Sequence, residues 1–170
     1  MHDIFVRDAK LDEAPIIVQM IRHMVTDMAG YGGYAPATDD GAWNTLITRI
    51  AEELKGDQGK YLMAESTNVG PVGAAAAELI NLHGAFAPMK TLHISVVYVL
   101  PQHRRGGIGT MMLERLLDWG RAAEAQHCDL NVLANSPANA LYRKHGFSVF
   151  ELKLVRSLQP GTGGLRVSNL

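Results

Sequence analysis

Apolar and polar residues alternate along this chain with changing periods, and the changes predict the order of its helices and strands. Apolar residues three and four apart predict helices at residues 12–28, from Thr38 as N-cap to about 54, and from 107 to about 125. Apolar runs between turn signals predict strands at residues 3–7, 61–65, 72–80, 91–100, 129–134 and 147–157, with a short helix at residues 137–145. The order has no internal repeat and predicts one domain over residues 1–158, followed by a flexible tail at residues 159–170.

A glycine-rich turn lies between a long apolar run and the helix predicted at residue 107. Its sequence is Arg104-Arg105-Gly106-Gly107-Ile108-Gly109-Thr110. The start of a helix leaves backbone N–H groups without partners, and glycine lets an anion approach them closely. Together with the helix dipole and two arginines, these groups predict a cradle for a diphosphate.

Two familiar phosphate-binding patterns do not fit this turn. The ATP and GTP loop requires Gly-Lys-Ser or Gly-Lys-Thr, and neither occurs in the chain. The dinucleotide pattern G-x-G-x-x-G has Met112 where its third glycine belongs, and no acidic residue follows where the next predicted strand ends at Ala134-Asn135. The pattern that remains is R-x-x-G-x-G, matched by Arg104, Gly107 and Gly109.

The residues on both sides of the turn extend this pattern. Val97-Tyr98-Val99-Leu100-Pro101 precedes it, and Asn135-Ser136-Pro137-Ala138-Asn139-Ala140-Leu141-Tyr142 and His145-Gly146-Phe147 follow it. Together these segments resemble the acyl-CoA-binding motif, the preceding strand and the N-x-x-A-x-x-L-Y…G-F segment of the GNAT superfamily of N-acetyltransferases. The resemblance covers about residues 3–157.

The resemblance implies both a fold and a co-substrate. The fold would be α/β, of the α+β type, with a mixed, mostly antiparallel, twisted sheet flanked by helices and splayed near Val99 and Ala134. The co-substrate would be acetyl-CoA, with the backbone of Val97 and Val99 along its arm and the Val99 N–H, or one beside it, facing the thioester oxygen. The full set of expected contacts is Val97, Val99, Arg104, Arg105, Gly106, Gly107, Ile108, Gly109, Thr110, Asn135 and Ala138.

Acyl transfer to an amine requires an acid for the departing sulfur and a base for the amine. Tyr142 matches the family's tyrosine, and a phenol with an ordinary pKa of about 10 is protonated at neutral pH. Ser95 stands where many members carry a glutamate base, so His93, on the same face of a regular strand, becomes the candidate base. Glu65, Glu78 and a chain of water molecules are the alternatives.

The resemblance also places the first two helices and their connection over the acceptor site. Glycines and tyrosines in that connection suit a mobile lid, and an acidic side chain could attract a cationic amine. The residues expected at this border are Met24, Met28, Tyr31, Tyr34, Asp39 and Asp40.

Composition and charge narrow the classes of partner. The chain has 170 residues, of which 47% are hydrophobic and 19% charged, as in globular proteins, and its net charge of -1 argues against binding nucleic acid. No apolar run is long enough to span a bilayer, and residues 1–7 lack the apolar core of a signal peptide, so we expect no membrane partner and a cytoplasmic location. Cys128 is the single cysteine, and the histidines lack metal-ligand spacing, so we expect no disulfide within the chain and no metal.

These observations lead to one functional expectation with two alternatives. The first is direct transfer of an acetyl group from acetyl-CoA to a primary amine of a small molecule. The second is acetylation of a protein or peptide amine, and the third is a catalytically silent acyl-CoA-binding module, suggested by Ser95. A nicotinamide-dependent enzyme is remote because its motif is incomplete, and a homodimer is compatible with the family's frequent dimers.

Overall fold

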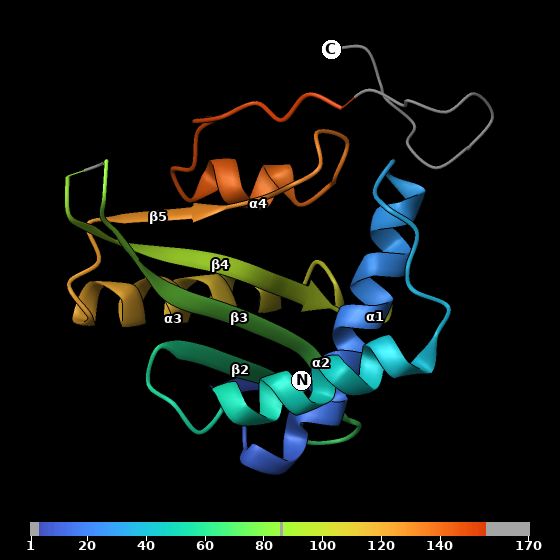
Figure 1. Cartoon of the computed structure of the whole chain (residues 1–170). Helices are drawn as coiled ribbons and strands as arrows, with labels where there is room; N and C mark the ends of the chain where they lie inside the picture. The colour runs from blue at the N-terminus through green and yellow to red at the C-terminus, as the bar shows by residue number, and fades with distance from the viewer. Residues whose placement is uncertain (1–3, 86, 156–170) are drawn as a thin grey trace.

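The computed structural model describes residues 4–85 and 87–155. These residues form a five-stranded sheet with helices on both faces (Figure 1). Single turns of 3-10 helix at Leu11–Glu13 and Pro101–His103 precede α1 and follow β4. The elements, in chain order, are β1 (Ile4–Asp8), α1 (Ala14–Gly30), α2 (Asp40–Glu53), β2 (Gly59–Ser66), β3 (Gly70–Leu82), β4 (Met89–Val99), α3 (Ile108–Ala122), β5 (His127–Leu130) and α4 (Asn139–Lys144).

The strands lie side by side in chain order, from β1 to β5. Every neighbouring pair is antiparallel except β4 and β5, which are parallel. A parallel pair needs a long crossover connection, and here α3 provides it. The mixed, mostly antiparallel sheet flanked by helices that the sequence predicts is therefore confirmed.

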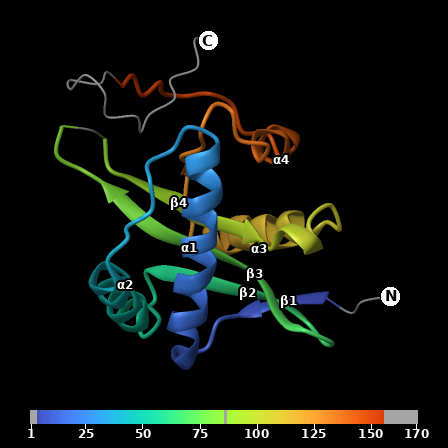
Figure 2. The ribbon, with the colours of Figure 1, turned by 90° about the vertical axis from the view of Figure 1, so that its right-hand side faces the viewer.

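The two faces of the sheet carry different helices, as Figure 2 shows, with α1 and α2 on one face and α3 on the other. The middle of β3 serves both faces: Ala75 and Ala77 pack in the cluster that contains α3, and Ala74 and Ala76 pack beside α1. All are at most 3% exposed. Alanine has a low preference for strands, but its small side chain suits a strand that is covered on both faces. None of the helices in the described part of the chain has the length and apolar character to span a bilayer.

An irregularity in β4 opens the sheet. Ala76 pairs with Val96 and Ala77 with Ile94, so Ser95 is the extra residue of a β-bulge, which bends a strand locally. The parallel pairing with β5 ends at Ile94 and Leu130, immediately before the bulge. Beyond this point the two strands separate (Figure 1), and β4 continues to Val99 with no partner on that side among the described residues. The expected splay is present, but it begins earlier than the predicted positions Val99 and Ala134.

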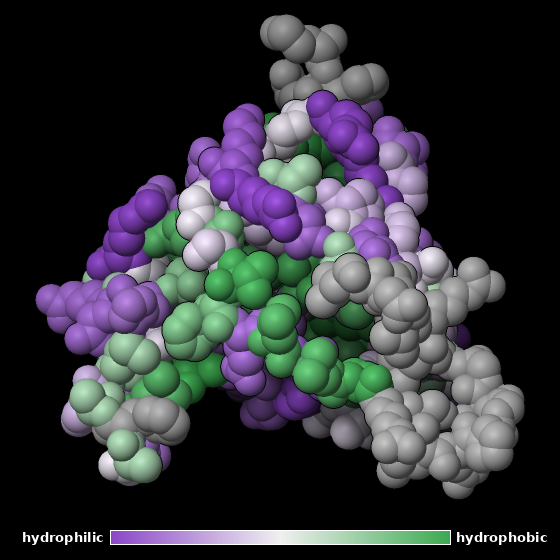
Figure 3. All heavy atoms as spheres, turned by 90° about the horizontal axis from the view of Figure 1, so that it is seen from above, coloured by the Kyte–Doolittle hydropathy of each residue, from purple (hydrophilic) through white to green (hydrophobic). Residues whose placement is uncertain are grey.

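Two predicted strands differ from the structure in the last part of the chain. The strand expected at residues 129–134 lies at His127–Leu130. Residues 147–155 form no strand, although their apolar residues are spaced like one, because no strand edge among the described residues pairs with them. Their apolar side chains are therefore exposed, Phe150 by 98% and Leu154 by 86%. Figure 3 shows hydrophobic side chains gathered in the middle of the face that is seen from above. Residues 156–157 of this prediction, and the predicted tail at 159–170, lie outside the described residues.

The N-cap of α2 is Asp39 and not the predicted Thr38. The Asp39 carboxylate accepts hydrogen bonds from the Gly41 and Ala42 amides at 2.9 and 3.1 Å. A carboxylate also interacts well with the positive end of a helix dipole, which a hydroxyl does not match.

A nearly buried ion pair fastens the start of the chain to the sheet. Arg7 on β1 donates to both Glu13 oxygens at 2.6 and 2.8 Å and to Glu65 on β2 at 2.6 Å. Glu13 is 8% exposed and also accepts from the Lys10 amide at 2.7 Å. The hydrogen bond from Arg7 is the main reason that the pKa of Glu13 is lowered.

Replacing Glu13 by Gln should weaken the fold at neutral pH and much less in acid. The change removes a charge that holds Arg7 while it keeps the side-chain shape, and we expect the free energy of unfolding to fall by about 1.5–3 kcal/mol. Because the pKa of Glu13 is lowered by folding, its contribution is complete above the ordinary value of 4.5 and is lost as pH falls through the lowered pKa.

Thermal unfolding followed by circular dichroism from neutral pH to about pH 3 checks this prediction. Glu52→Gln is the matched control, since the Glu52 side chain is 66% exposed and its ion pair is with Lys55, three residues later in the chain. A difference between Glu13→Gln and the wild type that is constant over this pH range contradicts the assignment.

Candidate active site

The turn between β4 and α3 has a backbone that directs main-chain groups outward. Arg105 has a φ of 68° and Gly107 a φ of 81°, both in the left-handed region. Glycine adopts this conformation freely, whereas an arginine there is strained by about 1–2 kcal/mol. Gly107 is the N-cap of α3, and no side chain caps the helix. The turn therefore shapes the helix start without covering it.

The amide groups of residues 105–110 have no hydrogen-bond acceptor among the described residues. The first amide bonded within α3 is that of Met111, which donates to the Gly107 oxygen at 3.0 Å. A diphosphate can accept from such donors, and the positive end of the helix dipole favours its charge. The chemistry of this turn thus fits the group that the sequence predicts for it.

The last residues of β4 offer further backbone groups beside the turn. The Leu100 amide donates to the Val72 oxygen at 2.9 Å, toward β3. Because backbone groups alternate along a strand, those of Val97 and Val99 point the other way, into the gap that β5 leaves. A linear arm lying in this gap could pair with them as an added strand would.

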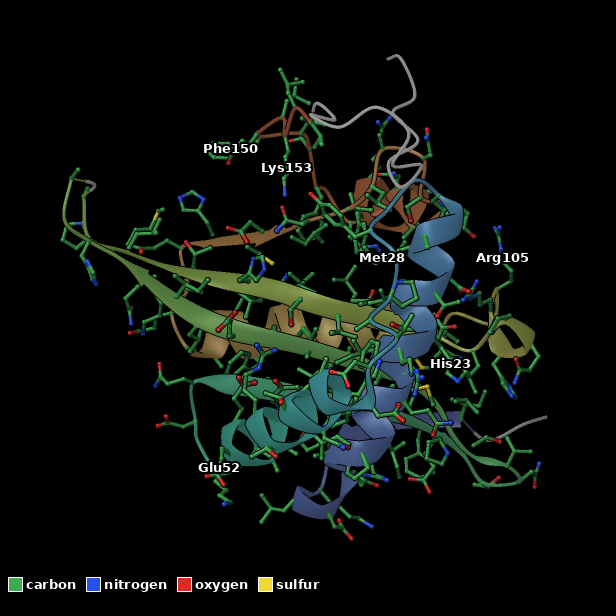
Figure 4. All side chains as sticks on the ribbon, turned by 45° about the vertical axis from the view of Figure 1, so that its right-hand side comes forward. His23, Met28, Glu52, Arg105, Phe150 and Lys153 are labelled. Atoms are coloured by element: carbon green, nitrogen blue, oxygen red, sulfur yellow. The ribbon has the colours of Figure 1, made fainter. Side chains whose placement is uncertain are left out.

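The two arginines before the helix lie in different surroundings. Arg104 makes an ion pair with Asp27 of α1 at 2.6 Å and donates to the Val99 oxygen at 2.8 Å. Arg105 makes no hydrogen bond or ion pair with any described residue, and Figure 4 shows its side chain projecting away from the loop. The sequence predicts both as cofactor contacts, but only Arg105 has its charge unengaged.

Tyr142 of α4 is buried beside the same gap. It is 9% exposed, packs in the cluster that contains Ile108, Val97 and Val99, and meets the Phe147 ring edge to face at 5.9 Å. Its hydroxyl finds no hydrogen-bond partner among the residues that the structure describes. Burial raises the pKa of Tyr142, so the phenol is protonated at neutral pH and can act as a donor.

The segment between β5 and α4 is held together by Asn139. Its amide nitrogen donates to the carbonyl oxygens of Leu133, Ala134 and Ser136 at 2.9, 3.1 and 3.0 Å. The predicted contact Ala138 donates its own amide to the Ser136 hydroxyl at 3.2 Å and is the N-cap of α4. Asn135, the other predicted contact, lies exposed in this segment, and its role is a prediction.

His93 lies on the part of β4 that is still paired with β5. Its Nδ1 is 2.5 Å from Asp129 on β5, and Glu78 is its partner on β3. It precedes Val97 by four residues and Val99 by six, or about 13 and 20 Å at the rise of a strand. On a regular strand His93 and Ser95 would share one face, but the bulge at Ser95 breaks that regularity. Glu65, another candidate base, is bound to Arg7 on β1.

The connection between α1 and α2 approaches the end of β5. Gly33 has no room for a side chain, because a Cβ there would lie 2.8 Å from the Met28 oxygen and 3.1 Å from Leu133. The Lys153 ammonium lies 5.8 Å from the centre of the Tyr34 ring. Of the predicted acidic residues, Asp39 is used as a helix cap and Asp40 stays largely exposed, 3.7 Å from Arg22.

Comparison with known sequences identifies the family of this chain. The profile of the Acetyltransferase (GNAT) family matches residues 20–147, which hold most of α1, the glycine-rich turn and Tyr142. The chain belongs to the GNAT acetyltransferase family. It is therefore an acyltransferase, as the sequence predicts. A comparison with curated proteins found no match.

Solved structures share the fold of this acetyltransferase. A predicted acetyltransferase from Clostridium acetobutylicum, determined with acetyl-CoA, is 20% identical with a TM-score of 0.75, covering 91% of this chain and 96% of its own. A mutant form of the BH1408 protein from Bacillus halodurans is 18% identical with a TM-score of 0.74, covering 91% and 99%. Glucosamine-6-phosphate N-acetyltransferase from Arabidopsis thaliana is 14% identical with a TM-score of 0.66, covering 92% and 99%.

Sequence reasoning missed Asp27 and Tyr98 in this acetyltransferase. The Tyr98 hydroxyl donates to Asp27 at 3.3 Å, and the Arg104 guanidinium lies 5.2 Å from the centre of the Tyr98 ring. Asp27 lies in the last turn of α1, where the helix dipole disfavours a carboxylate. An acidic residue near the end of a helix is unfavourable by itself, so Asp27 was the signal in the sequence that a cationic partner lies beside it.

Replacing Gly107 by Ala should weaken both the fold and the binding of coenzyme A. There is open space around Gly107, but its φ of 81° disfavours a side chain, so we expect a loss of about 1–2 kcal/mol in unfolding free energy. If the turn relaxes to relieve this strain, its amides turn away, and we expect coenzyme A to bind about tenfold more weakly. Calorimetric titration and thermal unfolding measure the two effects.

Gly109→Ala is the control for backbone strain, because Gly109 has no positive φ and its added Cβ would lie 3.4 Å from Leu141. This variant should keep its stability. Any loss of coenzyme A binding in it is therefore due to the space that the added methyl group occupies and not to backbone strain. Wild-type affinity for coenzyme A in Gly107→Ala contradicts the role of the turn.

Proposed function

We propose that this protein transfers the acetyl group of acetyl-CoA directly to a primary amine of a small molecule. The observation that carries the proposal is the row of unbonded amides at residues 105–110, beside the gap between β4 and β5. Diphosphate and a linear arm are the two parts of coenzyme A that these surfaces fit. The Clostridium relative determined with acetyl-CoA and the Arabidopsis relative named for N-acetylation of an amino sugar phosphate support it.

The proposed chemistry gives each residue a separate task. Bound acetyl-CoA supplies a thioester carbon that a neutral amine attacks, so that a C–N bond forms and the C–S bond breaks. The amide of Val99, or one beside it, donates to the carbonyl oxygen as negative charge develops there. Tyr142 gives its proton to the departing sulfur and regains one from water.

The amine proton has the least direct path. His93 is the predicted base, but its distance from Val97 and Val99 along β4 leaves room only for transfer through water. Ser95 carries no group that accepts a proton unaided, and its hydroxyl lies 3.4 Å from the Ala76 oxygen. We propose that water takes the proton. If His93 takes part, it accepts the proton from the last of several water molecules and does not contact the amine.

The acceptor is proposed to enter from the side of α1 and the connection to α2. Tyr31, Tyr34 and the exposed Asp40 border this side, and Asp40 could attract a cationic amine. A catalytically silent acyl-CoA-binding module is the second candidate, favoured specifically by the absence of a carboxylate at Ser95.

An amine panel with acetyl-CoA separates these readings. The panel holds polyamines, amino acids, aminoglycosides, aryl amines and peptide N-termini, and the release of free thiol and the acylated product are both measured. Turnover of small amines supports the proposal, and turnover of peptides alone assigns a protein or peptide acceptor. Tight binding of acetyl-CoA without turnover of any amine supports the silent module.

Replacing Tyr142 by Phe should lower kcat by about a hundredfold while the affinity for acetyl-CoA changes little, because only the proton donor is lost. The ring and its packing on Phe147 are retained. Steady-state kinetics and calorimetric titration provide the measurement. Tyr61→Phe is the matched control, since its hydroxyl bonds to Glu53 on the other face of the sheet. Equal kcat values for Tyr142→Phe and the wild type remove the acid role.

Replacing His93 by Gln should change kcat by less than about threefold, given the distance of this side chain from the gap. His127→Gln, an exposed histidine of β5, is the control for general effects on this part of the sheet. Thermal unfolding should show a loss in His93→Gln, because the contact with Asp129 is broken. A drop in kcat of about a hundredfold or more in a folded His93→Gln would establish it as the base.

A further inference from the structure

The donors of Arg104 are directed at the protein itself. Its Nη2 lies 2.6 Å from Asp27 Oδ2, its Nε donates to the Val99 oxygen at 2.8 Å, and its planar group lies over the Tyr98 ring. The Arg104 and Asp27 side chains are 35% and 34% exposed, so this ion pair is only partly open to solvent. To face a diphosphate, Arg104 would have to give up these contacts.

Asp27 depends on Arg104 for its charge compensation. Its other described contact is the Tyr98 hydroxyl at 3.3 Å, which is a long and neutral hydrogen bond. Burial is the largest single effect and would lower the pKa of Arg104, but the hydrogen bond to Asp27, the charge of that carboxylate and the neighbouring tyrosines together outweigh it, so the pKa is raised. The arginine is thus held as a cation by its partner on α1.

The same guanidinium joins the elements on either side of the proposed site. Val99 is the last residue of β4, beside the gap, and its carbonyl is held by Arg104. Asp27 lies in the last turn of α1, next to the connection that borders the acceptor side. Arg105, one residue later, turns outward with a φ of 68° and makes no such contact.

We propose that Arg104 is a positioning residue that fixes the end of β4 against α1, and that Arg105 is the arginine that meets the diphosphate. This assignment rests on the proposed function. The sequence pattern predicts the same role for Arg104 and Arg105, whereas we assign them two different roles. Arg104 acts through Val99 and Asp27, so its loss disturbs the acetyl end of the site, whereas the loss of Arg105 disturbs the nucleotide end.

Two donors distinguish these roles: acetyl-CoA, and S-acetylpantetheine, which has the same thioester and no diphosphate. Arg105→Gln should raise KM for acetyl-CoA about fivefold or more and leave the kinetics with S-acetylpantetheine unchanged. Arg104→Gln should lower kcat about tenfold or more with both donors, because the end of β4 is displaced in both cases. A loss in Arg104→Gln that is confined to KM for acetyl-CoA makes Arg104 the diphosphate ligand and overturns the proposal.

Asp27→Asn provides the test if Arg104→Gln does not fold. It releases Arg104 without removing its charge, so a diphosphate ligand would be kept or improved, whereas a positioning residue would be lost. We expect the drop in kcat to match that of Arg104→Gln and to be the same with both donors. An unchanged kcat in folded Asp27→Asn overturns the positioning role.

Failure of the proposed function is recognised separately. If the wild type acetylates no amine, a cycle of Asp27→Asn, Arg104→Gln and the double variant in thermal unfolding still measures the pair. A double variant that loses less stability than the two single losses combined supports the tie between α1 and β4. Additive losses show that the two side chains are not coupled and overturn the proposal.

Discussion

The separation of β4 from β5 after Ile94 is the constraint on which the rest of the site depends. β4 stays paired with β3 to its end, so it cannot turn away freely, and the bulge at Ser95 provides the bend that lets it leave one neighbour only. The backbone groups of Val97 and Val99 would otherwise be consumed by a parallel ladder. The helix that follows adds the amides of residues 105–110, so one short stretch of chain presents main-chain donors from two kinds of element.

Because the proposed binding surface is made of main chain, the side chains around it are available for other tasks. Tyr142 supplies a hydroxyl from α4 on a side chain that is largely buried, and Asn139 holds the loop that carries α4 toward the gap. Arg104, Tyr98 and Asp27 form a polar group between the end of β4 and α1. We propose that the neighbouring positions Arg104 and Arg105 differ in function, since Arg105 has a left-handed backbone and shares none of the contacts of Arg104.

The sequence predicts most of the fold and the location of the site, but not its internal contacts. Long periodic segments such as α1 and α3 and the glycine-rich turn are recognisable because their signals are local. The bulge at Ser95 and the early end of β5 at Leu130 depend on how strands pair, which no local pattern records. The same holds for residues 147–155, whose alternation is that of a strand although no described strand edge pairs with it. Contacts between distant residues, such as Asp27 with Arg104, were likewise beyond a reading of motifs.

The run of alanines in β3 has a consequence for how the two halves of the enzyme are spaced. Ala74 and Ala76 lie under α1, and Ala75 and Ala77 lie under the α3 layer, so single methyl groups set the thickness of the molecule at its centre. α1 borders the side where we propose the acceptor enters, and α3 begins at the turn that we propose binds the diphosphate. If both proposals hold, the spacing between these two sides is set by residues that touch neither ligand. A larger side chain at one of these alanines would then change that spacing while every proposed catalytic group keeps its identity.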